Sequence, residues 1–128
     1  MSSGQGGSYS SNGIGVASGA VAVIAGGGSN VGRSDAITGI GGAKDLSLEV
    51  SIAGTTPNVK VEIEVKVRGG SAYVLPDTGA AGLISAGITD TNAHVFALSV
   101  PVCSEVKLKF TNLHAANAAT PSYVLNWQ

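Results

Sequence analysis

The chain is short of cysteine and of charge of either sign, and each shortage excludes a class of protein. It has one cysteine, Cys103, so no disulfide can form within the chain and nothing suggests an oxidising compartment. No cysteine–histidine pair has the spacing of a zinc site. With 7 basic and 8 acidic residues the net charge is −1, which argues against a protein that follows nucleic-acid phosphates.

Charged residues make up only 12% of the 128 residues, whereas glycine occurs 19 times. Globular domains average about a quarter charged residues, so we expect partners to cover part of this surface. The apolar run Ile14–Ile24 lacks the basic start of a signal peptide and is too short to span a bilayer. The length is that of one domain, expected as a soluble product made in the cytoplasm.

What the chain does have is alternation, most clearly from Val59 to Val67, where it reads VKVEIEVKV. Successive side chains of a β-strand point to opposite faces, so the five apolar residues share one face. The other face then carries the charged residues, which we expect to lie in water: Lys60, Glu62, Glu64 and Lys66. This pattern is typical of an antiparallel strand with one side on a core.

Shorter alternating runs predict the remaining strands: Leu46–Ile52, Tyr73–Leu75, Leu83–Ile88, His94–Val100, Glu105–Asn112 and Tyr123–Trp127. Turn residues at Gly54–Asn58 separate the first of these from the strand that begins at Val59, which predicts a hairpin. Leu113–Pro121 is predicted to be a loop, and Cys103 a buried small side chain. Without a repeat of fixed period, the pattern favours an all-β antiparallel sandwich, jelly-roll or immunoglobulin-like.

The N-terminal part is different in composition. Met1–Gly13 contains almost only Ser, Gly, Gln and Asn around Tyr9, and is predicted to be a flexible arm because it has little apolar surface to bury. Residues 14–128 are predicted to form one domain. Within it, residues 14–42 hold short apolar runs, such as Ile37–Gly42, between glycines, and fit either a part of the sandwich or an extended arm.

Few residues suggest chemistry. Leu75–Gly79 matches a sortase-type anchoring signal, but no apolar span follows it, so we interpret it as a tight turn. His94 follows Asp90 by four residues, an offset that we do not expect to align them, and His114 is expected to be solvated. The turn carboxylates are too dispersed for a calcium loop: Asp45, Asp77 and Asp90. We therefore expect no catalytic residue, metal or cofactor, and no enzyme activity.

Aromatic side chains on an open sheet face would suggest stacking against sugars, and the candidates are Tyr73, Tyr123 and Trp127. Tyr123 and Trp127 share a strand face with Leu125, so burial in a core or subunit interface is the favoured interpretation. The candidate assembly contacts combine these two residues with the apolar residues of the N-terminal part: Tyr9, Ile14, Val16, Val21, Val23, Tyr123 and Trp127.

The C-terminal half, from His94 to Trp127, has an apolar strand, the segment Val100-Pro101-Val102, a charged alternating strand, an Ala/Asn/Thr loop and a closing strand. This layout resembles small β-sandwich virion proteins of tailed bacteriophages, including head decoration proteins, over roughly residues 45–128. The resemblance implies a non-enzymatic capsid-decoration role, a homo-oligomer with a trimer favoured, a major capsid or other virion protein as partner, and location in the virion. The alternative is a carbohydrate- or receptor-binding module of a fibre or secreted protein.

Overall fold

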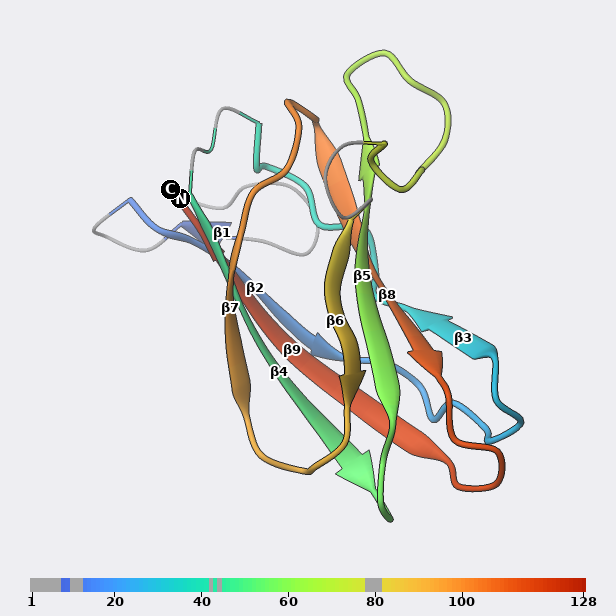
Figure 1. Ribbon diagram of the computed structural model, residues 1–128. Coiled ribbons are helices and arrows are strands. Elements are labelled where there is room, and N and C mark those ends of the chain that lie inside the picture. The colour runs from blue at the N-terminus through green and yellow to red at the C-terminus, as the bar shows by residue number, and fades with distance from the viewer. Residues whose placement is uncertain (1–7, 10–12, 42, 44, 78–81) are drawn as a thin grey trace.

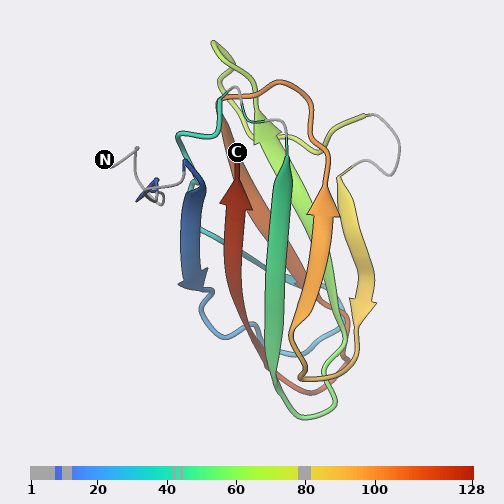
Figure 2. The ribbon, with the colours of Figure 1, turned by 90° about the vertical axis from the view of Figure 1, so that its left-hand side faces the viewer.

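The computed structural model describes residues 8–9, 13–41, 43, 45–77 and 82–128, which form nine β-strands and no helix (Figure 1). All strand pairs are antiparallel, and the sheet orders are β1-β2-β9-β4-β7 and β3-β8-β5-β6. Figure 2 looks onto the five-stranded sheet, with the four-stranded sheet behind it. The strands are β1 (Ser8–Tyr9), β2 (Gly15–Ala20), β3 (Asn30–Arg33), β4 (Leu46–Gly54), β5 (Val59–Lys66), β6 (Leu83–Ile88), β7 (His94–Leu98), β8 (Glu105–Asn112) and β9 (Ala119–Trp127). The predicted all-β sandwich is confirmed.

The core lies between the two sheets and is built from alternate residues of the long central strands. β4 and β9 line it from one side, and β5 and β8 from the other, as their alternation predicted. Its largest fully buried apolar side chains are Phe110, Ile37, Leu48, Ile52, Leu108 and Leu125. Val67 was expected on the inner face of the strand, but β5 ends at Lys66 and Val67 is exposed.

The predicted hairpin between the strands at residues 46–52 and 59–67 is wrong. β4 pairs with β7 and β9 in one sheet, whereas β5 pairs with β6 and β8 in the other. The connection therefore crosses from sheet to sheet. It leaves Gly54 at φ +151°, where an added Cβ would lie 2.8 Å from the carbonyl oxygen of Ala118, and it holds Thr56 at φ 43°. Turn residues predicted the change of direction but not the sheet to which it leads.

The open question about residues 14–42 is settled for those described: they belong to the sandwich. β2 pairs with β9 and β3 with β8. Their apolar side chains enter the core: Val21, Ile24, Ile37 and Ile40. The Ile37–Gly42 run makes one bridge, from Ile37 to Val106, and Gly42 lies outside the described residues. Most of the predicted arm, residues 1–7 and 10–12, also lies outside them.

Some element boundaries differ from those predicted. β3 was not predicted, because its Asn-Val-Gly-Arg sequence has little alternation. Tyr73–Leu75 makes a single bridge, from Val74 to Val65, which continues the edge of the four-stranded sheet beyond β6. β9 begins at Ala119, inside the stretch predicted to be a loop, and buries Pro121.

Candidate functional site

Most of the charge of the chain lies on the outer face of the four-stranded sheet. Five of the seven basic residues and three of the eight acidic ones are there: Arg33, Lys60, Lys66, Lys107, Lys109, Glu62, Glu64 and Glu105. β8 and β5 place them in register, with Glu62 opposite Lys109 and Glu64 opposite Lys107. We call this surface the charged face.

The expectation that the acidic residues of β5 lie in water is wrong. Glu62 and Glu64 are 8% and 7% exposed, because β5 is an inner strand and the longer side chains of its neighbours cover it. Glu64 Oε1 accepts a hydrogen bond of 2.8 Å from Arg33 Nε, which raises the pKa of Arg33. Glu62 Oε1 lies 3.6 Å from Lys60 Nζ and 3.9 Å from Lys109 Nζ. This oxygen accepts no hydrogen bond from any of the described residues.

Tyr73 lies at one end of the charged face, where the bridge at Val74 holds its segment beside β5. Its hydroxyl donates a hydrogen bond to Glu105 Oε1. The ammonium nitrogens of Lys107 and Lys66 are 4.6 Å and 5.8 Å from the centre of its ring. Burial, together with the hydrogen bond and negative charge of Glu105, raises the pKa of Tyr73 to about 12, so the phenol stays protonated at neutral pH. One aromatic ring, two ammonium groups and a carboxylate thus meet on a partly exposed surface.

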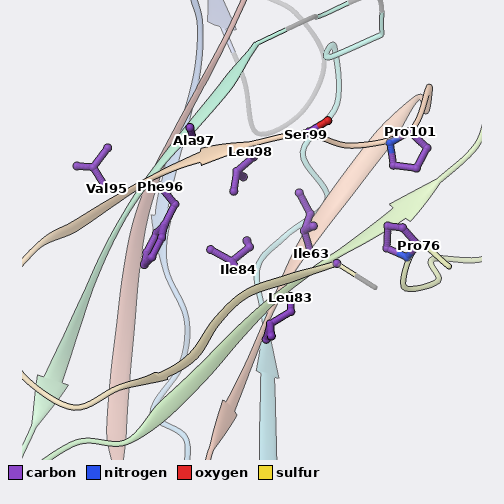
Figure 3. A pocket seen from close by; sticks show the side chains of 11 residues that line it. Ile63, Pro76, Leu83, Ile84, Val95, Phe96, Ala97, Leu98, Ser99 and Pro101 are labelled. Atoms are coloured by element: carbon purple, nitrogen blue, oxygen red, sulfur yellow. The ribbon is translucent and has the colours of Figure 1, made fainter. Parts of the chain in front are cut away.

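A cavity of about 520 Å³ lies elsewhere, between the edge strands β6 and β7. Figure 3 shows Phe96, Leu98 and Ile84 pointing into it, while Val95 points away from it. Among its described lining residues Ser99 alone has a polar side chain. The volume suits a small ligand. A sugar would find almost no side-chain partner there for its hydroxyl groups, although polar backbone groups of the lining segments also face the cavity.

Two expectations about histidine are wrong. Asp90 and His94 are aligned after all: Asp90 Oδ1 lies 2.7 Å from His94 Nε2 and also accepts a hydrogen bond from the Asn92 backbone. His94 lies parallel to Phe96, with ring centres 6.3 Å apart. His114 is half-buried rather than solvated, and its Nδ1 accepts hydrogen bonds from the backbone N–H groups of residues 116 and 117. Both rings therefore organise turns.

No group of three or more His, Cys, Asp or Glu side chains gathers as a metal site within the described ranges. Cys103 is buried as predicted, and burial raises the pKa of its thiol. In the same ranges no helix is long and apolar enough to cross a membrane. The sortase-like segment Leu75–Gly79 is described only as far as Asp77, and its last two residues lie outside.

Of the aromatic candidates for sugar stacking, only Tyr73 keeps a partly exposed ring. Tyr123 and Trp127 are buried on the inner face of β9, in line with the favoured interpretation, so neither ring offers a surface for stacking. Burial, with the charge of Asp35, raises the pKa of Tyr123. Phe96 is a half-buried aromatic residue of the edge strand β7 and was not among the predicted stacking candidates.

The candidate assembly contacts divide by burial. Val21, Tyr123 and Trp127 lie in the core of this chain and offer almost no side-chain surface to another molecule. Val23 is 66% exposed, and Ile14 and Val16 are half-buried. Tyr9 belongs to β1, and its side chain lies outside what the structure describes. A role in assembly stays a prediction for all seven.

No family model matches the sequence, and no curated protein is similar to it in sequence. Solved structures are similar in fold. A domain of tailspike protein 4 of bacteriophage CBA120, described as enzymatically active, superposes with a TM-score of 0.56 and 11% identity over 90% of this chain. The chain spans only 18% of the length of that protein. The CBM22-1 xylan-binding domain from Paenibacillus barcinonensis gives a TM-score of 0.53 with 11% identity, covering 94% of this chain and 75% of that domain. At such identities the likeness is one of fold.

Proposed function

We propose that this chain is a non-catalytic module that binds a carbohydrate chain at the Tyr73 end of the charged face. The observation that carries the proposal is the arrangement of Tyr73, Lys66, Lys107 and Glu105 on one partly exposed surface. It is the place in the described structure where an aromatic ring with accessible surface meets hydrogen-bonding side chains of both charges.

Each of these groups has a use in sugar recognition. A pyranose ring has C–H groups on one face, which pack against an aromatic ring, and hydroxyl groups at its rim. Glu105 can accept hydrogen bonds from such hydroxyls, and the two lysines can donate to their oxygens, as charge-assisted bonds. Lys107 covers the Tyr73 ring with a flexible four-carbon stem, so a ligand displaces a side chain that can move and then bind it. The excess of cations on this face favours a glycan that carries acidic groups.

The fold supports the proposal. The xylan-binding domain shares the sandwich architecture over nearly the whole chain, which makes carbohydrate binding a function that this architecture is known to carry. A fold hosts many functions, so the Tyr73 surface supports carbohydrate binding more directly than the superposition does.

A second candidate function is a structural component of a phage virion. The similarity in fold to a tailspike domain and the small share of charged residues favour it. The two candidates are compatible, since a glycan-binding module in a phage fibre would combine them. A chain that assembles on capsid proteins and shows no glycan binding would support the second alone.

A pair of Tyr73 variants tests the proposal. On a glycan array, and by calorimetric titration with soluble xylan and with polygalacturonate, the wild type should bind at least one class of glycan. Tyr73→Ala removes the ring and should weaken binding about fivefold or more, since stacking against an aromatic residue is worth about 1 kcal/mol. Tyr73→Phe, the matched control, keeps the ring and should retain most of the affinity. Both variants must melt cooperatively like the wild type.

Two outcomes would contradict the proposal. One is the absence of any bound glycan on the array and in both titrations. The other is equal binding by the wild type and Tyr73→Ala, which would place any glycan site elsewhere on the molecule.

A further inference from the structure

The two edges of the sandwich are closed to different degrees. On the side of β2 and β3, residues 21–29 run from one sheet to the other, with backbone bonds from Ile24 to Ala119 and from Gly27 to His114. On the opposite side β7 and β6 end their sheets, and Figure 2 shows them next to each other there. Among the described strands β7 pairs only with β4 and β6 only with β5.

The open side lacks some of the devices that usually protect a sheet edge, although its strands are short and the pairing of β6 is irregular. Neither β6 nor β7 contains Lys, Arg, Asp, Glu or Pro. β7 also keeps an unbroken register with β4 over all five of its residues, so its free edge is a regular template for another strand. The pairing of β6 with β5 is irregular, which makes β6 better suited to apolar contact than to a second ladder.

Exposed apolar side chains gather on the same side. Seven large hydrophobic side chains of the described residues are exposed, and four of them lie on β6, β7 or the segments that adjoin them: Val74, Leu83, Val95 and Val102. Val95 is 70% and Val102 94% exposed. The apolar cavity between β6 and β7 opens on this side as well. Val95 faces the outer side of the five-stranded sheet, so these side chains flank the edge rather than form one patch. Exposed apolar side chains in this number favour a protein interface along the edge.

We propose that this edge binds a second copy of the chain, with β7 antiparallel to β7 of the partner about a two-fold axis. A two-fold axis perpendicular to the sheets makes the two β7 strands antiparallel neighbours and brings the same apolar groove of each copy together. β6, β7, residues 74–77 and residues 99–102 hold about 20 residues, which is what one side of a stable interface contributes. In an isologous pair, one contact covers the free edge of β7 in both copies. An added peptide strand would cover the edge of one copy only.

This inference goes beyond the glycan-binding proposal and uses a surface that adjoins the Tyr73 site at Val74 without including the Tyr73 ring. The ring of Tyr73 lies over Lys66 and Lys107 on the outer face of the four-stranded sheet, away from the free edge of β7. It also changes two sequence-based expectations, because the interface lies away from the N-terminal residues and the symmetry is two-fold rather than three-fold.

Sedimentation over a concentration range tests the inference. The wild type should be a dimer at about 100 µM. Val95→Lys and Leu83→Lys each place a cation on one of the two edge strands, where an apolar interface would have to bury it or bring it near a second copy, and each should raise the dimer dissociation constant at least tenfold. Val23→Lys makes the same change at an equally exposed valine of the closed side and should leave the constant unchanged. Amide exchange at residues 94–98 should slow as the wild-type concentration rises.

A wild type that stays monomeric at that concentration, or that forms a trimer, overturns the inference. So does a dimer weakened by Val23→Lys and not by Val95→Lys. If residues 94–98 gain protection only on adding another protein, the edge takes a different partner and the dimer is wrong. Glycan binding is measured separately and stays unaffected by any of these results.

Discussion

At the scale of single residues, side chains that form hydrogen bonds within their own turns explain why the expectations about the histidines were wrong. Asp90 accepts a bond from the backbone N–H of Asn92, which folds the chain back and brings His94 to the same carboxylate. An offset of four residues across a turn and into a strand does not by itself predict this alignment. Asn112 is a similar case: its buried amide donates to carbonyl oxygens of residues 24, 25 and 117, so one side chain joins three segments. Neither arrangement has a signature in spacing.

Asp90→Asn should lower the melting temperature at pH 7. The hydrogen bond from His94, and then that from the Asn92 backbone, hold the pKa of Asp90 below its ordinary value of 3.8. A carboxyl group with a depressed pKa in the folded state stabilises it above the unfolded pKa and loses this contribution as the pH falls through the folded pKa. The gap between wild type and variant should therefore be full above about pH 4 and vanish in stronger acid.

Thermal melts across pH 2–7 measure that gap. In a His94→Ala background the same substitution should have a smaller effect, because one of the two bonds is already gone. An equal loss in both backgrounds would show that His94 does not interact with Asp90 in solution.

At the scale of elements, alternation predicts a strand and its inward face well, and says little about its neighbours. The inward faces of β4, β5, β8 and β9 were predictable because burial on one side requires a period of two. The sheet to which each strand belongs depends on contacts distant in sequence, so a short connection rich in turn residues reads the same whether it stays in one sheet or crosses. The Tyr73 site combines segments 32 residues apart and was out of reach for the same reason.

Gly15 in β2 depends on a contact of this distant kind. A Cβ at Gly15 would lie 2.1 Å from the Trp127 ring of β9, whereas one at Gly19 would lie 3.0 Å from the Tyr123 hydroxyl, the far end of its side chain. Gly15→Ala should therefore lower the free energy of unfolding by about 1–3 kcal/mol, as overpacking does, and Gly19→Ala by less. Chemical denaturation measures both, with Ser18→Ala in the same strand as control. A stabilising effect of Gly15→Ala would contradict this packing.

At the scale of the whole molecule, the length predicted one domain, and the small share of charged residues predicted that partners cover part of its surface. It did not predict that the few charges gather on one face, where flanking strands bury two glutamates beneath longer cations. Nor did it decide the place of residues 14–42, whose short apolar runs enter the core only because β9 and β8 offer them partners. Strand content is local information, whereas the distribution of strands between layers is not.

Deletion of Met1–Gly13 tests how much of the molecule the N-terminal residues support. The earliest residue of the hydrophobic core is Ala17, so the shortened chain should still melt in one cooperative transition by circular dichroism. It should also sediment as a dimer, because the proposed interface is on the opposite edge of the five-stranded sheet. Loss of the cooperative transition would show that these residues are part of the fold. A folded but monomeric product would instead assign assembly to them.

The position of β9 has a consequence for shortened forms of the chain. β9 is the last of the described strands in sequence order, yet it lies in the middle of the five-stranded sheet, between β2 and β4. Without its nine residues, β2 has no long neighbouring strand, and the core loses the side chains that β9 contributes to it. A chain cut before Ala119 lacks the strand that joins β2 to β4, and we expect it not to form the sandwich.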